Sequence, residues 1–206
     1  MHPAKEVGGD FYDFFLIDQD HCGVVIADVS GKGVPAALFM MRVKALLNQL
    51  LREDLSPDQV LARANDGLCE DNEAGMFVTV WLGVLDLRSG KLVYANGGHN
   101  PPLYRHADGS VEWMRDRSGL LLGSFEGVPY RVFERTMIRG DSLILYTDGV
   151  TEAMDASDHC YGDERLFQLV ERECDGYPAS VSGVIEEDVR AFAIPRIARY
   201  KVPKRV

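Results

Sequence analysis

Apolar and polar positions follow one another in short runs that are bounded by glycine, proline and acidic residues. Runs of this length that are rich in β-branched and aromatic side chains predict β-strands. We predict strands over residues 11–17, 22–29, 77–87, 91–96, 130–138 and 142–147. The dipeptide Ser89–Gly90 predicts a hairpin between two of these strands, and Asp108–Gly109 predicts a further turn.

Denser apolar patterns predict helices over residues 35–51, 57–70, 164–173 and 180–192. Pro35 and Pro57 stand in first turns, where proline removes no hydrogen bond, and Ser56 is a suitable N-cap. The first helix is apolar nearly all round, so we expect it to be substantially buried. Because strands and helices do not alternate regularly, we expect an α+β fold with antiparallel sheet covered by helices.

Composition and charge narrow the classes of protein. With 206 residues, 46% of them hydrophobic and 26% charged, the chain suits a globular protein. A net charge of -10 argues against non-specific binding to nucleic acid, which requires basic surfaces. The four cysteines form no CxxC pair, which argues against a zinc site and for reduced thiols in the cytoplasm. We find no transmembrane segment and no signal-peptide pattern.

Three aspartates stand where predicted strands meet glycine-containing turns. Asp10 follows Gly8 and Gly9, Asp28 ends the second predicted strand, and Asp148 precedes a glycine at the end of the last one. Clustered carboxylates repel one another and need a compensating cation, and oxygen ligands suit Mg²⁺ or Mn²⁺. Aspartate beside glycine is also ordinary turn chemistry, so the residue types alone leave both interpretations open.

Longer stretches around these aspartates resemble one family. They are PAKEVGGDFYDFF (3–15), ADVSGKGVPAALFM (27–40), YANGGHNPPLY (94–104) and GDSLILYTDGVTEA (140–153), with FVTVWLGVLD (77–86) between the second and third. In order and spacing they resemble the SpoIIE/RsbU branch of the PPM, or type 2C, protein phosphatases. The resemblance covers roughly residues 3–193, and four ordered blocks are a far more specific signal than one short pattern.

The resemblance implies an αββα sandwich, in which two antiparallel sheets are flanked by helix pairs. It implies two Mn²⁺ or Mg²⁺ ions, with Asp28 bridging both, the Val29 carbonyl binding one and Asp148 binding the other. Asp10 would contribute directly or through water. The implied reaction is hydrolysis of phosphoserine or phosphothreonine on a protein by metal-activated water. The implied substrate is an anti-sigma-factor antagonist of a bacterial stress or sporulation switch.

Several other residues have alternative roles. His99 is expected either to protonate the leaving oxygen or to fix its turn by hydrogen bonds. The Ser30 hydroxyl is expected to cap the following turn, and Glu152 to orient water or a ligand, or to be a surface charge. Lys32 lies in SGKG, but the full phosphate-loop pattern is absent, which argues against ATP binding.

The sequence departs from the family at both ends. Only Met1 and His2 precede Pro3, so the family's first strand is clipped. The family's last strand, with its Asp-Asp-[Ile/Met]-Thr ligand, is replaced by IPRIARYKVPKRV, and no aspartate follows Asp188. We therefore assign residues 1–193 to a phosphatase domain and 194–206 to an atypical basic tail. We expect the second metal site to be impaired.

Two hypotheses about function follow. The first is an active metal-dependent phosphatase, and the second is a catalytically weak or dead pseudophosphatase that acts as a binding module. A weaker third idea gives the basic tail an affinity for anionic surfaces. Oligomeric state and any upstream sensor domain leave no pattern in the sequence.

Overall fold

The computed structural model describes residues 8–173 and 178–197. The chain forms two compact units. Unit 1 comprises Met1–Asn100 with Arg115–Met137, and unit 2 comprises Pro101–Met114 with Ile138–Val206. Each unit has its own sheet, its own helices and its own hydrophobic core. The two units are described separately below.

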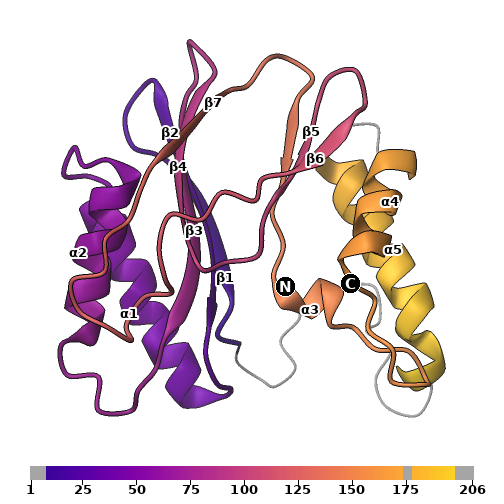
Figure 1. Ribbon diagram of the computed structural model, residues 1–206, viewed down its shortest axis with the longest axis horizontal. Helices are drawn as coiled ribbons and strands as arrows, with labels where there is room; N and C mark the ends of the chain where they lie inside the picture. The colour runs from indigo at the N-terminus through magenta and orange to yellow at the C-terminus, as the bar shows by residue number, and fades with distance from the viewer. Residues whose placement is uncertain (1–7, 174–177, 198–206) are drawn as a thin grey trace. The chain divides into compact units, whose positions relative to one another are not determined.

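Unit 1 is built on a five-stranded antiparallel sheet, in the order β1-β2-β3-β4-β7 (Figure 1). The strands are β1 (Phe11–Leu16), β2 (His21–Val29), β3 (Val78–Asp86), β4 (Lys91–Gly97) and β7 (Phe133–Thr136). Ala27 of β2 pairs with Phe11 of β1, and the next residue, Asp28, pairs with Thr79 of β3. This register sets which side chains share a face of the sheet.

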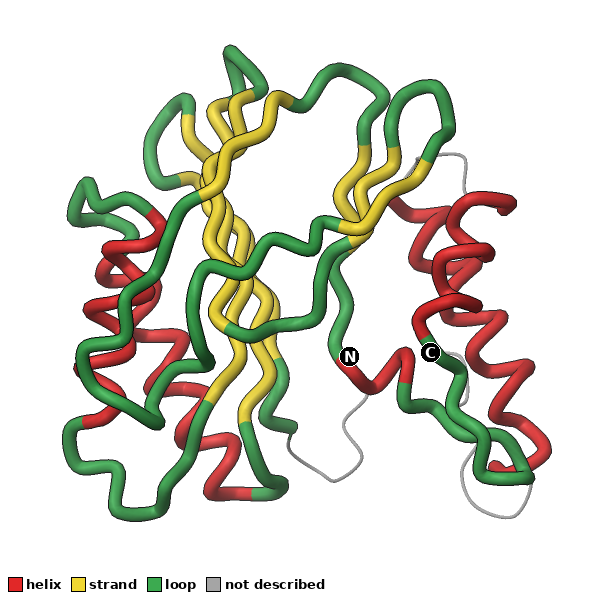
Figure 2. The backbone as a smooth tube through the Cα atoms, in the orientation of Figure 1, coloured by secondary structure: helices red, strands yellow, loops and turns green. Residues whose placement is uncertain are grey.

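Two helices, α1 (Val34–Leu50) and α2 (Pro57–Cys69), cover one face of this sheet (Figure 2). The core between them contains alternate residues of β2, namely Val25, Ala27 and Val29. The helices meet them with buried aliphatic and aromatic side chains, among them Phe39, Val43, Leu47, Leu61 and Leu68. The predicted N-cap of α2, Ser56, is confirmed, and it forms a capping box in which Ser56 and Gln59 bond reciprocally to the backbone.

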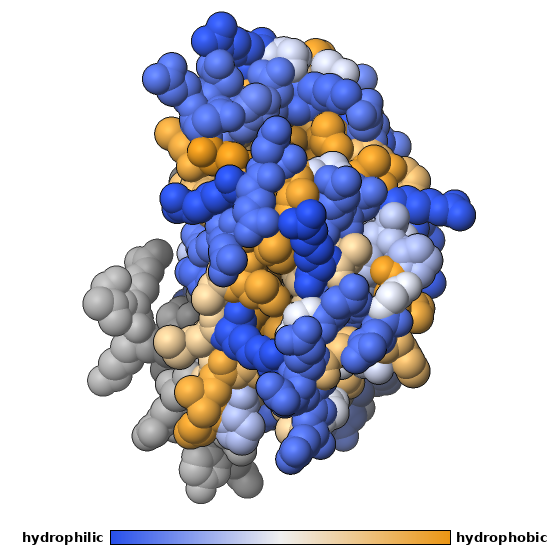
Figure 3. Space-filling view, turned by 90° about the vertical axis from the view of Figure 1, so that its left-hand side faces the viewer, coloured by the Kyte–Doolittle hydropathy of each residue, from blue (hydrophilic) through white to orange (hydrophobic). Residues whose placement is uncertain are grey.

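Helix α1 is only partly buried, which corrects the expectation drawn from its composition. Its sheet-facing residues are buried, but Val34, Leu38 and Met41 are each more than 60% exposed. Apolar side chains break the polar surface on the side of unit 1 that carries α1 and α2 (Figure 3). A helix that is apolar all round can therefore still cover a sheet with one face only.

Unit 2 contains a three-stranded antiparallel sheet, in the order β6-β5-β8. Its strands are β5 (Leu103–Arg105), β6 (Val111–Trp113) and β8 (Ser142–Ile144). Helices α3 (Asp148–Thr151), α4 (Asp163–Glu173) and α5 (Pro178–Ile197) follow in the chain. The sheet and the two longer helices share a core of Leu103, Ile144, Tyr146, Tyr161, Leu166, Val170 and Val181.

The predicted fold class is confirmed, because two antiparallel sheets each pack against a helix pair. The sequence did not reveal β5 and β6 as strands or the one-turn helix α3. Helix α5 ends at Ile197, four residues into the segment assigned to the tail, and the rest of that segment lies outside the described residues. The expectation of a clipped first strand also falls on residues outside them. None of the described helices is long and apolar enough to cross a membrane.

The Asp141 carboxylate ties the turn before β8 to β5 and the residues that follow it. It accepts hydrogen bonds from the Tyr104 hydroxyl, from the Ala107 N–H at 2.9 Å and from the Ile138 N–H at 2.9 Å. Burial acts to raise the pKa of Asp141, but these hydrogen bonds outweigh it and the pKa lies below its usual value. The ionised carboxylate therefore stabilises unit 2.

We predict that Asp141→Asn lowers the free energy of unfolding by about 1–3 kcal/mol near pH 7, because an amide group then faces N–H donors. A depressed folded-state pKa stabilises the protein above the unfolded value of about 3.9 and ceases to do so as pH falls. The difference from wild type should therefore shrink below about pH 4. Urea unfolding followed by circular dichroism measures both effects. Asp108→Asn, at an exposed carboxylate that bonds only within its own turn, is the control.

Candidate functional site

Asp28 and Asp10 lie at neighbouring strand ends in unit 1. Asp28 stands between Ala27 and Val29, which point into the core beneath the helices, so its half-buried side chain occupies the opposite face of the sheet. Asp10 comes one residue before β1, just beyond the last β1–β2 pair, Phe11 with Ala27. Extending the register by one residue sets Asp10 beside Asp28. We therefore expect these two aspartates, which are 18 residues apart in the sequence, to lie beside each other.

The backbone around Val29 leaves little space for a side chain at position 9. A Cβ added to the buried Gly9 would lie 3.1 Å from the Val29 carbonyl oxygen and 3.2 Å from the Val29 Cβ. Glycine at this position therefore lets the chain before β1 run close to that carbonyl. The predicted carbonyl ligand and the predicted carboxylate ligands of unit 1 belong to one small region of the sheet.

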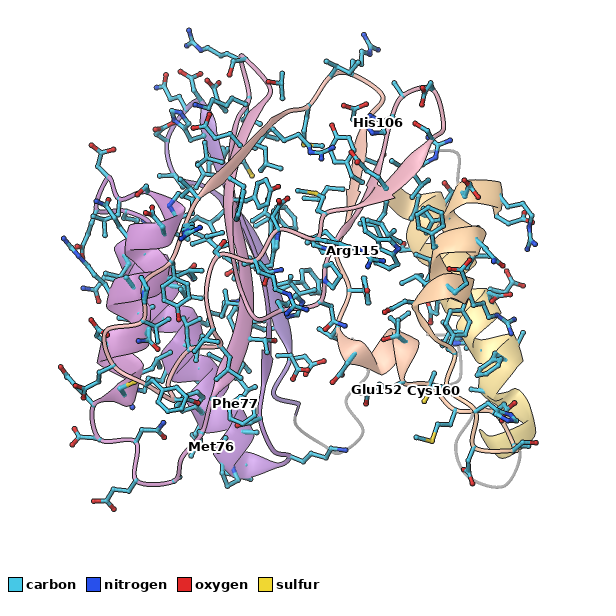
Figure 4. The ribbon with its side chains drawn as sticks, in the orientation of Figure 1. Met76, Phe77, His106, Arg115, Glu152 and Cys160 are labelled. Atoms are coloured by element: carbon cyan, nitrogen blue, oxygen red, sulfur yellow. The ribbon has the colours of Figure 1, made fainter. Side chains whose placement is uncertain are left out.

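Ser30 extends the β2–β3 pairing instead of capping the turn that follows it. Its N–H donates to the Phe77 carbonyl at 2.9 Å, and its hydroxyl accepts the Phe77 N–H at 2.9 Å. Figure 4 labels this partner, Phe77, and the preceding residue, Met76. The N-cap of α1 is Gly33, which makes no side-chain capping bond, so the capping role predicted for Ser30 is wrong.

His99 is buried in a network of polar groups. Its ring Nδ1 lies 2.9 Å from the Thr79 hydroxyl, and its side chain is almost fully enclosed. Asn96 accepts the His99 N–H at 2.8 Å and donates to the His99 carbonyl at 3.1 Å. The Ser118 hydroxyl in turn accepts the Asn96 N–H at 2.6 Å. The structure thus shows the turn-fixing hydrogen bonds expected of the residues around His99.

The two glycines before His99 make its position possible. Gly98 has a φ of 77°, and an added Cβ would lie 3.1 Å from the Leu121 backbone nitrogen. At Gly97 an added Cβ would lie 2.6 Å from the Leu122 side chain. A side chain at either position would push the end of β4 away from the segment containing Leu121 and Leu122. Close packing around the polar network therefore requires glycine at the two positions before His99.

Asp148 and Glu152 belong to unit 2. Asp148 is the first residue of α3 and does not directly end a strand, because β8 stops at Ile144. Its carbonyl accepts the Glu152 N–H at 2.7 Å, and the Glu152 side chain is exposed (Figure 4). The convergence of Asp148 with Asp10 and Asp28 stays a prediction.

The donors of unit 1 fit a hard divalent cation, since two carboxylates and a backbone carbonyl are all oxygen ligands. No group of three or more His, Cys, Asp or Glu side chains able to hold a metal ion is found within residues 8–173 and 178–197. A cation bound by the unit 1 donors alone would therefore have an incomplete coordination shell. Further oxygen ligands must come from water, from substrate or from elsewhere in the chain.

Asp188 is the last aspartate of the sequence, and its carboxylate is engaged in structural contacts. It accepts the Tyr161 hydroxyl at 2.6 Å and the Arg165 Nε–H at 3.0 Å. The hydrogen bond from Arg165 is the main reason that the pKa of Asp188 lies below its usual value. Arg165 also lies over the Tyr161 and Phe192 rings. Asp188 thus joins α4 to α5, and its carboxylate is used for structural contacts.

Comparison with known proteins defines the class. The fold is that of PP2C phosphatase domains: the PP2C domain of SpoIIE from Bacillus subtilis matches with a TM-score of 0.79 at 18% identity, over 93% of this chain and 56% of that one. The family model of Stage II sporulation protein E (SpoIIE) matches residues 18–193. The chain belongs to the SpoIIE family, which confirms the resemblance.

Two further relatives place the chain within this family. Phosphoserine phosphatase RsbU of Bacillus subtilis (strain 168) is 34% identical over 150 residues, which make up 73% of this chain and 44% of RsbU. The structure of the RsbU and RsbW domains of Rv1364c from Mycobacterium tuberculosis has a TM-score of 0.74 at 26% identity, over 92% of this chain and 52% of that one. The chain spans less than half the length of RsbU.

We predict that Gly98→Ala destabilises the protein more than Gly75→Ala. Both glycines have positive φ, but a Cβ at Gly75 meets nothing within 4 Å, whereas one at Gly98 meets backbone. Strain alone should cost about 1–2 kcal/mol at either position, and the contact with Leu121 should add at least about 1 kcal/mol at Gly98. Urea unfolding measures the difference. Equal losses of stability would contradict the assigned packing.

Proposed function

We propose that the chain is the catalytic part of a metal-dependent protein serine/threonine phosphatase. The observation that carries the proposal is the position of Asp10 and Asp28 at neighbouring strand ends, with Val29 next to Asp28, in a chain that belongs to the SpoIIE family. The proposed substrates are phosphoserine and phosphothreonine side chains of a regulatory protein. RsbU, the relative described above, is a phosphoserine phosphatase.

Each proposed ligand has one role. Asp28 would bind both Mn²⁺ or Mg²⁺ ions, the Val29 carbonyl would bind one of them, and Asp10 would contribute directly or through water. Asp148 is the proposed ligand from unit 2. The bound cations supply electrostatic stabilisation of phosphate oxygens and lower the pKa of water. The side chains themselves form no covalent bond to phosphate in this proposal, so no nucleophilic serine or cysteine is needed.

The proposed protein partner is an anti-sigma-factor antagonist in its phosphorylated form. This proposal rests on the family to which the chain belongs. The net charge of -10 keeps nucleic acid an improbable partner.

A second candidate function is a catalytically weak or inactive pseudophosphatase that binds its partner without turnover. It is favoured by the replacement of the terminal aspartate strand and by the structural contacts that engage Asp188. Losing a group that orients a metal ligand lowers affinity or activity by about 10- to 100-fold, and losing a direct ligand should cost at least as much.

We predict that Asp28→Asn removes Mn²⁺-dependent hydrolysis of p-nitrophenyl phosphate, with a loss of at least about 100-fold. The matched control is Asp13→Asn. Asp13 lies on β1, two residues after Phe11, and its carboxylate forms an ion pair with the Lys44 Nζ at 3.1 Å. This control should retain wild-type turnover. Hydrolysis that continues undiminished in excess chelator would rule out the metal mechanism.

The two candidate functions predict different turnover when the family's terminal strand is added to the chain. Appending an Asp-Asp-Ile-Thr strand after α5 should raise turnover by at least about 10-fold if a lost ligand limits the enzyme. The same addition with alanines in place of both aspartates is the control and should leave turnover unchanged. A chain that stays inactive with the restored aspartates would show that this ligand is not the limiting defect.

A further inference from the structure

Thr79 and the buried His99 form a hydrogen-bonded pair, and Thr79 is the residue opposite Asp28 in the sheet. Thr79 lies between Val78 and Val80, which point into the helix-covered core, so its hydroxyl shares the opposite face with Asp28. The two residues are direct partners across β2 and β3. Partners in an antiparallel pair have Cβ atoms about 4.5–5.5 Å apart, which brings the hydroxyl within reach of the carboxylate.

The Thr79 hydroxyl has one proton to donate and two neighbours. One is the His99 Nδ1, at 2.9 Å, and the second, which we infer from the strand register that sets Asp28 opposite Thr79, is the Asp28 carboxylate. A hydrogen bond to an ionised carboxylate is stronger than one to a neutral imidazole. The favoured arrangement therefore has the Thr79 O–H donating to Asp28 and its oxygen accepting the His99 Nδ1–H.

The rest of the network is built to hold the imidazole in place. Asn96 bonds to both the N–H and the carbonyl of His99, and Ser118 bonds to the backbone of Asn96. All three of these polar residues are at most 5% exposed. Fully bonded buried networks are rigid, so the ring has little freedom to turn away from Thr79.

We propose that Thr79 and His99 are positioning residues for Asp28. Through one directed chain of hydrogen bonds, from the His99 Nδ1–H to the Thr79 oxygen and from the Thr79 O–H to the carboxylate, they hold Asp28 in the orientation that binds cations. The inference rests on the proposed function, because Asp28 must be a metal ligand for its orientation to matter. Residues that orient metal ligands typically change metal affinity by about 10- to 100-fold.

The first test uses the Thr79 hydroxyl. Thr79→Val keeps the shape of the side chain and removes the donor, so it should weaken Mn²⁺ binding by about 10-fold or more in calorimetric titration. It should also lower kcat for p-nitrophenyl phosphate more than it changes KM. Thr79→Ser restores the hydroxyl and should recover most of the Mn²⁺ affinity. An unchanged Mn²⁺ affinity in Thr79→Val would overturn the proposal.

The second test uses the imidazole. Nitrogen NMR of the wild-type chain should show His99 protonated on Nδ1, which requires no mutation. His99→Asn keeps an N–H donor near that position and should retain more Mn²⁺ affinity than His99→Gln, whose amide corresponds to Nε2. A neutral His99 protonated on Nε2 alone would reverse the direction of the chain and sink the proposal.

Two controls separate this proposal from simpler explanations. Tyr94→Phe removes the hydrogen bond from the Tyr94 hydroxyl to Asp116, which lies outside this network, so it should lower stability without a comparable loss of Mn²⁺ affinity. Asp28→Asn tests the proposed function itself. If Asp28→Asn abolishes Mn²⁺ binding and Thr79→Val does not affect it, only the positioning role fails. If Asp28→Asn leaves Mn²⁺ binding unchanged, the metal-ligand role of Asp28 fails.

Discussion

The antiparallel register of β2 between β1 and β3 is the constraint on which the proposed site depends. Because side chains alternate across a strand, burying Ala27 and Val29 under the helices sends Asp28 to the other face. A slip by one residue would move a carboxylate into the aliphatic core, where an unpaired charge is very costly. The apolar packing of α1 and α2 against the sheet therefore determines where the carboxylate lies.

Glycine and buried polar groups extend this constraint to the residues around Asp28. Gly9 permits close approach to the Val29 carbonyl, and Gly97 and Gly98 let the end of β4 pass beneath the segment that contains Leu121 and Leu122. These contacts leave room for His99 to reach Thr79 from a turn outside the sheet. The motif residues with no catalytic chemistry of their own thus shape the space in which the carboxylates act.

The aspartates of this chain have different roles. Asp141 and Asp188 each accept several hydrogen bonds, which lower their pKa values and join separate elements of unit 2. Asp10 directly precedes β1, and Asp28 lies one residue before the end of β2. The net charge of -10 does not show which carboxylates are structural, because the role of each carboxylate depends on the groups that surround it.

The sequence by itself determined the family, the α+β class, most strands and helices, and the aspartates at the ends of β1 and β2, because periodicity and turn residues are local properties. It did not reveal the short strands β5 and β6, the exposed face of α1 or the structural use of Asp188. Only the tertiary structure decided that Ser30 bonds to Phe77 and that His99 meets Thr79. Those contacts join residues 47 and 20 positions apart, and their formation depends on strand register and close packing, which no local pattern encodes.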